Sequence, residues 1–410
     1  MSSGESAHQQ ITRLDRVPGM TRISLVLLAG ALTAAPAEVR RDSRDPGNLV
    51  AHEWGTFTSV AGEQGQPIEW LPLEGQDDLP CFVERFRNFR AKFALSGTVR
   101  METPVIYFYA PQATTVDVSV RFPAGLVTEW FPRADVTPAT PVTNATLTSS
   151  GFASTATWSK VAITPHAPEA FPTEPRSSHY YAARRTDAAP LKVGAQSEKF
   201  LFYRGVARVT PPVSAVVAPD GTATVRSQGA APLSTIVRFD RRSGKLGYEI
   251  KDTKESRATL STPALTGDMD TLAVRLETVL AREGLYPREA RAMVDTWRDS
   301  WFEEGTRLLY IVPRATVDAM LPLDIKPRPI ETARVFVGRL ELITPATTAE
   351  VKRALETQDR AALLKYGRFL LPISQRIVAD PDAGLDAKGL EQFIYGTFAD
   401  LTRGRSCGNR

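Results

Sequence analysis

Residues 101–109, Met-Glu-Thr-Pro-Val-Ile-Tyr-Phe-Tyr, form a dense apolar run with a single acidic residue near its start. A short run of this kind is typical of a β-strand that is covered on both faces. Further along the chain, Val116, Val118, Val120 and Phe122 alternate with polar residues, which predicts a strand with one buried face. Together these segments indicate a sheet with its own core.

Two β-hairpins are expected after residue 210. Residues 214–217 and 222–226 flank a Pro-Asp-Gly turn, and residues 233–239 and 246–250 flank a turn that contains Ser-Gly. Many short strands separated by turns are typical of an antiparallel sandwich or a barrel-like sheet. We therefore expect residues 51–265 to form a β-rich, sandwich-like antiparallel domain.

The pattern becomes helical after about residue 266. Apolar residues in 269–280 fall on one helical face, between a suitable N-cap at Asp268 and a stop at Gly284. Pro287 is suited to the first turn of a second helix. Further expected elements are strands at 306–312 and 333–343, helices within 346–379 with a kink or an end at Pro372, and a closing helix at 385–402. Residues 266–410 should form a mixed, helix-rich domain, and the whole fold should be α+β.

Residues 20–37 have the features of a secretory signal peptide. Arg22 provides the positive charge, Ile23 to Leu32 the short apolar segment, and Ala35-Pro36-Ala37 the small residues of a cleavage site. The apolar segment is shorter than the roughly 20 residues that a membrane-spanning helix needs. We therefore expect a protein that is periplasmic or secreted.

The true start is then expected at Met20, so that residues 1–37 are a mis-called extension plus the signal peptide, and residues 38–50 are a linker. Removing residues 1–37 takes three arginines and two acidic residues from a total of 50 basic and 46 acidic residues, which leaves a net charge of +3. Nucleic-acid binding needs a concentrated basic face, so we expect no nucleic-acid partner. No other segment is long and apolar enough to cross a bilayer, so the mature chain should be soluble, without a membrane span.

The sequence contains two cysteines, Cys81 and Cys407. An even number in an oxidising compartment favours a disulfide bond, which would link the C-terminal tail to the first domain. The alternative is that Cys81 is a small buried apolar residue and Cys407 is unpaired. Neither cysteine has a neighbour at the spacing of a redox or zinc motif.

Histidine is scarce, so the clusters around it are informative. His52 and Glu53 begin the segment His-Glu-Trp-Gly-Thr-Phe-Thr-Ser, where either could be a ligand or a general base, or His52 could be a structural histidine at a strand end. On a strand the two side chains would point to opposite faces. His179 precedes Arg184, which could contact an anionic or sugar-like ligand or be paired within a polar loop. We hypothesise that these four residues form one polar site.

Three carboxylates are in unusual places. Glu102 lies inside an apolar strand, where it needs a cationic partner or a raised pKa. Glu303 and Glu304 lie at the end of a predicted helix, where a carboxylate opposes the helix dipole. We expect a partner such as Arg307 for these two residues, or a functional role.

No catalytic signature of high specificity is present. The sequence lacks a GxSxG elbow, a Walker A loop, a GxGxxG turn after a strand and a haem-attachment motif. His52 and Glu53 do not complete a metal-binding HExxH motif, because no second histidine follows. Trp297 and Trp301, one turn apart on a predicted helix, form an aromatic stripe that is more typical of a core. The cofactor and metal content are unknown from the sequence.

Several segments resemble a family of uncharacterised exported bacterial proteins. They are 52–59 (HEWGTFTS), 101–109 (METPVIYFY), 179–184 (HYYAAR), 198–206 (EKFLFYRGV) and 297–314, which runs from WRDSWFEEG to LLYIVPR. The resemblance spans nearly all of the expected mature chain. It implies export and a shared fold, and no activity or residue role, because none is established for the family.

Two classes of function are therefore open. One is an exported ligand-binding or envelope-assembly protein with a small-molecule, glycan or protein partner. The other is an extracytoplasmic hydrolase or metal-assisted enzyme, with the candidate histidines and carboxylates at the domain boundary. We favour binding or assembly, because no acid, base or nucleophile is signalled at the strength of a motif.

Overall fold

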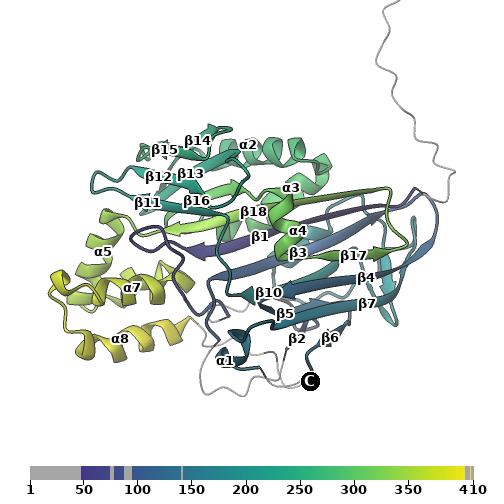
Figure 1. Cartoon of the computed structure of the whole chain (residues 1–410), viewed down its shortest axis with the longest axis horizontal. Coiled ribbons are helices and arrows are strands. Elements are labelled where there is room, and N and C mark those ends of the chain that lie inside the picture. Colours follow the sequence, from purple (N-terminus) through teal and green to yellow (C-terminus); the bar gives the residue numbers. More distant parts are fainter. Residues whose placement is uncertain (1–47, 74–77, 87–94, 140–141, 402–406, 408–410) are drawn as a thin grey trace, which may run out of the picture. The chain divides into compact units, whose positions relative to one another are not determined.

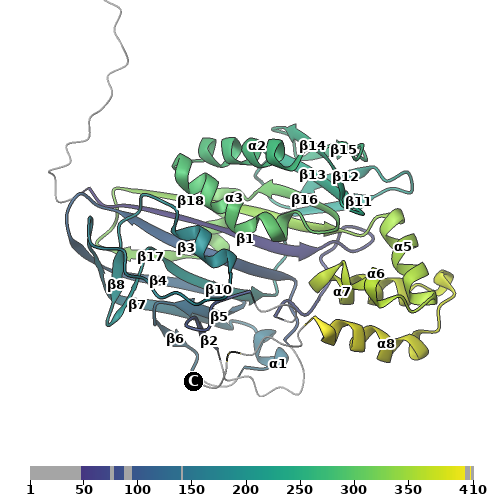
Figure 2. The ribbon, with the colours of Figure 1, turned by 180° about the vertical axis from the view of Figure 1, so that it is seen from behind.

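The computed structural model describes residues 48–73, 78–86, 95–139, 142–401 and 407 (Figures 1 and 2). The predicted signal peptide and nearly all of the predicted linker lie outside the described residues. The fold is α+β, as predicted, with a β-rich first part and most of the helices in the C-terminal part.

A nine-stranded mixed sheet forms the centre of the fold. Its strands, in order across the sheet, are β14 (Lys245–Asp252), β13 (Thr235–Arg242), β16 (Gly305–Ile311), β18 (Glu331–Leu342), β1 (Val50–Val60), β3 (Val99–Tyr109), β10 (Leu201–Ala207), β5 (Gly125–Phe131) and β2 (Glu84–Arg85). The β1–β18 pair is parallel, and all other neighbours are antiparallel. β3, which contains the run 101–109, is buried at every residue but the last, as a strand covered on both faces should be.

The two expected domains share this sheet. β1 pairs with β18, and β13 pairs with β16, so the sheet crosses the expected boundary at residue 265 twice. The described residues all fall in one compact unit. The predicted boundary therefore does not divide the fold. The change of periodicity after residue 265 marks a helical layer inserted between strands of one sheet, because periodicity reports the type of an element and not the sheet that a strand joins.

Two smaller antiparallel sheets cover one face of the large sheet. The first contains β17 (Leu323–Lys326), β4 (Thr114–Pro123), β7 (Ala153–Ile163), β8 (Leu191–Val193) and β9 (Gln196–Glu198), with β6 (Asp135–Thr137) paired to β7; the second contains β11 (Val213–Val217), β12 (Ala223–Ser227) and β15 (Arg257–Leu260). The predicted alternation in β4 is confirmed, since its apolar residues face the shared core. Both predicted hairpins are confirmed as β11–β12 and β13–β14.

Two helices cover the opposite face of the large sheet, as Figures 1 and 2 show. They are α2 (Met269–Arg282) and α3 (Pro287–Trp301). The predicted cap is confirmed, because Asp268 accepts a hydrogen bond of 2.7 Å from the backbone N–H of Thr271. The predicted proline opens α3, where the missing N–H has no helical partner in any case.

The aromatic stripe on α3 belongs to the core. Trp297 and Trp301 are almost fully buried, and their rings stack with centroids 6.4 Å apart. The indole N–H of Trp301 donates to Thr56 Oγ1 at 3.2 Å, which ties the end of α3 to β1.

The C-terminal helices form a further apolar cluster with Trp70. The remaining helices are α1 (Asn144–Leu147), α4 (Arg314–Met320), α5 (Pro345–Glu356), α6 (Arg360–Leu364), α7 (Leu370–Val378), α8 (Ala387–Asp400) and the short 3₁₀ turns η1 (His179–Arg184), η2 (Gly367–Phe369) and η3 (Pro381–Ala383). Of the two outcomes predicted for Pro372, a kink or a helix end, the end is wrong. Pro372 lies in the first turn of α7, where proline is tolerated. In the described part of the chain, no helix combines the length and apolar character needed to span a bilayer.

The predicted disulfide bond is present. Cys81 and Cys407, 326 residues apart in sequence, are joined. The bond fastens the end of the chain to the segment that precedes β2.

Candidate functional site

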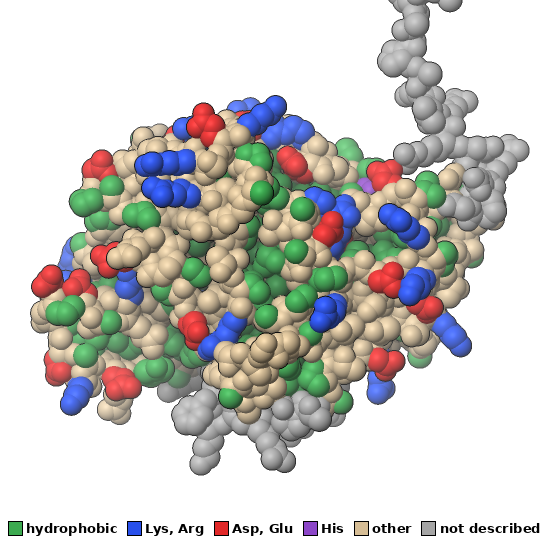
Figure 3. Space-filling model, in the orientation of Figure 1, with side chains coloured by type: hydrophobic (Ala, Val, Ile, Leu, Met, Phe, Trp, Pro, Cys, Tyr) green, Lys and Arg blue, Asp and Glu red, His purple; other side chains and the backbone are tan. Residues whose placement is uncertain are grey.

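Buried charge is the main signal of a functional site in this fold. On the face seen in Figure 3, acidic and basic side chains are interspersed. In the described interior, by contrast, six arginines are buried: Arg100, Arg204, Arg238, Arg307, Arg334 and Arg339. Arginine is rarely buried unless it is paired, so the partners of these side chains distinguish structural pairs from a site.

His52 points from β1 toward α3. It is fully buried, its Nδ1 lies 2.7 Å from Glu289 Oε2, and its ring packs against Tyr109 and Tyr286. The Glu289 carboxylate also accepts the backbone N–H of Tyr286 at 2.8 Å. His52 thus anchors the start of α3 to the sheet.

Glu53 points to the opposite face of β1, as the strand geometry predicted. It lies between the sheets, where it accepts hydrogen bonds from Arg334 and from the hydroxyl of Tyr203. Arg334 also reaches the Leu321 carbonyl at 2.6 Å and Asp318 at 2.7 Å. Burial works against the charge of Arg334, but the charge of Glu53 outweighs it and raises the arginine pKa. This is a buried structural ion pair.

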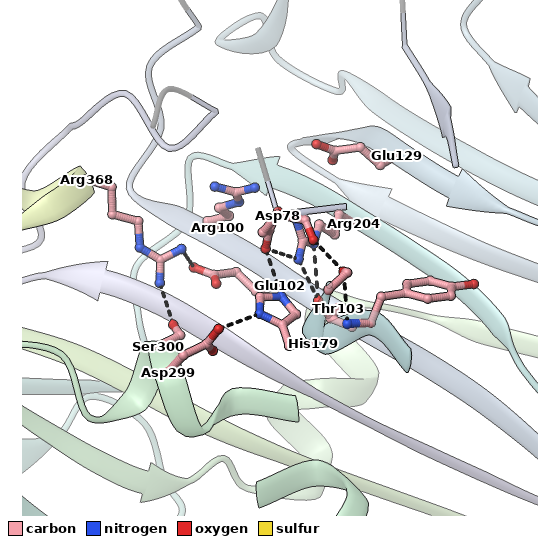
Figure 4. Close-up of polar contacts among 12 residues, drawn as sticks. Asp78, Arg100, Glu102, Thr103, Glu129, His179, Arg204, Asp299, Ser300 and Arg368 are labelled. Carbon is pink, nitrogen blue, oxygen red and sulfur yellow. Dashed lines mark hydrogen bonds and ion pairs between the residues drawn. The ribbon is translucent and has the colours of Figure 1, made fainter. Parts of the chain in front are cut away.

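His179, at the start of η1, lies between two carboxylates, as Figure 4 shows. Its Nε2 is 3.0 Å from Asp78 Oδ2 and its Nδ1 is 3.0 Å from Asp299 Oδ2. Burial alone would lower the pKa of His179, but the hydrogen bonds and charges of Asp299 and Asp78 outweigh it and raise the pKa to about 9. His179 is therefore a cation at neutral pH, with neither nitrogen available as a base.

The hypothesis that His52, Glu53, His179 and Arg184 form one site is not supported by the geometry. His52 contacts Glu289 and His179 contacts Asp299, ten residues further along α3, which is about 15 Å at the helical rise. Arg184 makes two hydrogen bonds to Glu198, of 2.9 and 2.7 Å, and lies against a group of aromatic rings. The four side chains belong to separate contacts.

Glu102 lies in a cluster of arginines. It is buried in β3, and its Oε1 is 2.8 Å from Nη1 of Arg368, which donates its Nη2 to Ser300 at 2.9 Å. Burial would raise the pKa of Glu102, but the positive charges of Arg368 and then Arg100 outweigh it and lower the pKa to about 2. The sequence-based expectation of a cationic partner is confirmed.

The residue after Glu102 has a strained backbone. Thr103 has φ of 44°, which is rare for a β-branched residue, and it lies where the pairing of β1 and β3 is irregular, between the partners of Trp54 and Thr56. Its hydroxyl accepts hydrogen bonds of 3.2 and 2.9 Å from Arg204, whose guanidinium also binds Asp78 through two contacts of 2.7 Å. The strain thus places Thr103 under the arginine that orients Asp78, and through it His179.

Glu303 belongs to this cluster and Glu304 does not. Glu303 accepts a hydrogen bond of 2.8 Å from Arg339, which also donates to Ser300 at 3.0 Å. The Glu304 carboxylate accepts from the backbone of Ser243. Arg307, the expected partner, binds the carbonyl oxygens of both glutamates and pairs its side chain with Glu341 at 2.9 Å.

We use the name arginine cluster for one group of charged and hydroxyl side chains. Its members are Thr58, Asp78, Arg100, Glu102, Thr103, His179, Arg204, Asp299, Ser300, Glu303, Arg339 and Arg368. The rim is open to solvent, with Asp299 66%, Glu303 31% and Asp78 30% exposed, while the arginines and Glu102 form a buried floor. In the described part of the chain, no set of three histidine, cysteine or carboxylate side chains could hold a metal ion. The cluster is suited to binding a polar ligand.

Most residues of the arginine cluster were not among the site residues predicted from the sequence. The signal that singled out Glu102, a charge inside an apolar strand, applies equally to Arg100, Arg204 and Arg339. Asp78 and Arg368 stand outside the strands and carry no comparable signal.

His179 should make protein stability depend on pH above neutrality. Its pKa of about 9 exceeds the ordinary value of 6.5, so its contribution is complete below pH 6.5 and is lost as the pH rises through 9. The loss is at most about 3 kcal/mol. Urea denaturation of wild type and His179→Gln should show a stability difference that shrinks between pH 6.5 and 9. A constant difference over this range would contradict the prediction.

Comparison with known proteins does not identify the chain. No family model matches it, and no curated protein matches it. Among solved structures, the Fcho1 Mu homology domain of Danio rerio with bound Eps15 peptide aligns with 72% of this chain and 96% of its own, at 9% identity and a TM-score of 0.25. A TM-score this low does not establish a shared fold.

Proposed function

We propose that the protein is an exported ligand-binding protein and that the arginine cluster holds a small polar ligand. The observation that carries the proposal is the arrangement of a solvent-open rim over a buried, charged floor, with strained Thr103 beneath it. Both side chains of the Glu53–Arg334 pair are almost fully buried, whereas the rim of this cluster includes Asp299, which is 66% exposed. Backbone strain at such a place is consistent with binding.

Binding is favoured over hydrolysis by the protonation states. Hydrolysis by paired carboxyl groups needs one group that is protonated near neutral pH. Here the arginines lower the pKa of Glu102 to about 2, and Arg204 holds the pKa of Asp78 well below its ordinary value although burial opposes this. His179 is occupied on both nitrogens. Glu102, Asp78 and His179 therefore carry fixed charges at neutral pH and are not matched to proton transfer there. The alternative of a hydrolase or metal-assisted enzyme stays a prediction with less support.

The two adjacent glutamates provide a matched test. A thermal-shift screen with neutral sugars, sugar acids, amino acids and dicarboxylates identifies a ligand, and calorimetry measures its affinity. Glu303→Gln should weaken binding about tenfold or more, because it removes the rim carboxylate that holds Arg339 of the floor. Glu304→Gln, the same substitution one residue on, should leave the affinity unchanged. A screen without any ligand, or equal effects of both substitutions, would count against the proposal.

Export is supported by the Cys81–Cys407 bond, since disulfide bonds persist in oxidising compartments. We expect cleavage after Ala37, so protein isolated from the native envelope or medium should begin at residue 38. N-terminal sequencing of that fraction is the measurement. An intact Met1 or Met20 terminus in a cytoplasmic fraction would refute export.

An envelope-assembly role has its own candidate surface. A groove of about 1010 Å³ runs along β11, an edge strand, and reaches the C-terminal helices through side chains such as Ile343 and Ile377. An edge strand beside an apolar groove suits an extended partner segment. A photo-cross-linker at position 216 should capture one discrete envelope protein, and a cross-linker at the exposed Val274 should not. Identical products from both positions would exclude this surface.

A further inference from the structure

We propose that the ligand of the arginine cluster carries an oxyanion, and that three side chains in a row across the sheet bind it: Arg100, Thr58 and Arg339. This inference rests on the proposed function, because it names the ligand class of the same site. The shared chemistry is a carboxylate, sulfate or phosphate group on a hydroxylated molecule.

The row follows from the register of three neighbouring strands. Thr58 of β1 pairs with Arg100 of β3 on one side and with Arg339 of β18 on the other. Directly paired residues project from the same face of a sheet. That face is the helical one, since Arg339 donates to Ser300 in the last turn of α3. The three side chains therefore stand side by side beneath the end of α3.

Each member of the row has an unsatisfied polar atom. Thr58 Oγ1, Arg100 Nε and Arg339 Nε are buried and have no hydrogen-bond partner among the described residues, and the same holds for Nε of the neighbouring Arg368. Buried polar groups are normally hydrogen-bonded, and each such group without a partner is unfavourable. Three of these four atoms can only donate, and the hydroxyl can also donate, so an acceptor would satisfy these four. Glu102 Oε1 in the same cluster also lacks a hydrogen bond, although it lies 2.8 Å from Arg368.

The balance of charge decides between an anion and water. Arg204 is paired with Asp78, Arg368 with Glu102, and Arg339 with Glu303. Among the described residues, Arg100 has no carboxylate within ion-pair distance, and its guanidinium donates only to the Pro72 carbonyl. Burial lowers the pKa of Arg100, and the charge of Glu102 offsets this only in part. Water could satisfy the hydrogen bonds, whereas an oxyanion would also place a negative charge beside Arg100, which has no ion-pair partner among the described residues.

The rim indicates the rest of the ligand. Asp78 and Asp299 are partly exposed, and the carboxyl oxygens of each can accept hydrogen bonds from hydroxyl groups. An oxyanion on the floor and hydroxyl groups at the rim describe a sugar acid or a sugar ester of an inorganic acid.

Three related sugars test this ligand class. The full chain is titrated in a calorimeter, at constant ionic strength, with three sugars. D-Glucuronate carries a carboxylate, D-glucose 6-phosphate carries a phosphate, and D-glucose carries no charge. At least one charged sugar should bind with a dissociation constant of roughly 1 mM or tighter and at least about tenfold tighter than glucose. Which one binds tighter identifies the oxyanion.

Two threonines on one face of β1 provide the matched variants. Thr58→Val removes only the unsatisfied hydroxyl and should weaken binding of the charged sugar about tenfold, and Thr58→Ser should restore it. Thr56→Val removes a hydroxyl that accepts from Trp301, so it should lower the melting temperature and leave the affinity unchanged. Equal binding of glucose and the charged sugars, no binding of either charged sugar, or no effect of Thr58→Val overturns the oxyanion site. If the screen instead finds a neutral ligand, and Glu303→Gln weakens its binding, the proposed function is supported although the oxyanion site is not.

Discussion

Replacing Arg334 by methionine is expected to lower the free energy of unfolding by about 3–5 kcal/mol. The Glu53 carboxylate is fully buried between the sheets, and Arg334 is its cationic partner. Without the guanidinium group, the Tyr203 hydroxyl is the one side-chain donor left to the carboxylate among the described residues, so an uncompensated charge stays in the core. Urea denaturation at pH 7 measures the change.

Two control variants separate charge from packing. The double variant Glu53→Gln with Arg334→Met removes both charges and should recover about half or more of the lost stability. Arg314→Met removes an arginine that pairs with Asp318 on the surface, and should change the stability by less than about 1 kcal/mol. If the double variant is as unstable as the single one, lost packing and not unpaired charge is the cause.

The strands and helices could be predicted from the sequence because their signals are local. The alternation in β4, the cap at Asp268 and the proline at the start of α3 each depend on a few neighbouring residues. The two-residue repeat of a β-strand also predicted that the side chains of His52 and Glu53 point to opposite faces of the sheet. Two side chains on opposite faces of a strand cannot line the same site, and in the structure they lie on opposite faces.

The arrangement of the site could not be predicted, because it depends on contacts between distant segments. His52 finds its partner 237 residues away and Glu53 finds Arg334 at a separation of 281 residues. The arginine cluster needs β1 to pair with β18, a parallel contact across the expected domain boundary. Buried charges in apolar strands indicate that a site exists, and the strand order decides which of them meet.

Loss of the Cys81–Cys407 bond is expected to be the second large effect. The bond spans 326 residues of sequence, and in the chain-entropy model a loop of this length contributes about 6 kcal/mol by restricting the unfolded chain, although measured effects are smaller. Cys407→Ser should therefore lower the free energy of unfolding by about 2–5 kcal/mol. Thiol counting under denaturing, non-reducing conditions should find no free thiol in the wild-type protein. Two free thiols would refute the bond.

The pKa of His179 reports whether the disulfide bond also affects the structure of the folded protein. Asp78, three residues before Cys81, contacts His179, so a displaced segment would change the histidine pKa. Arg204 holds Asp78 through two contacts of 2.7 Å and is itself buried against Thr103, independently of the disulfide. We therefore expect the pKa of His179, followed by NMR, to stay at about 9 in Cys407→Ser while the stability falls. A fall of this pKa toward 6.5 would mean instead that the bond holds Asp78 in place, because His179 would then have lost a carboxylate partner.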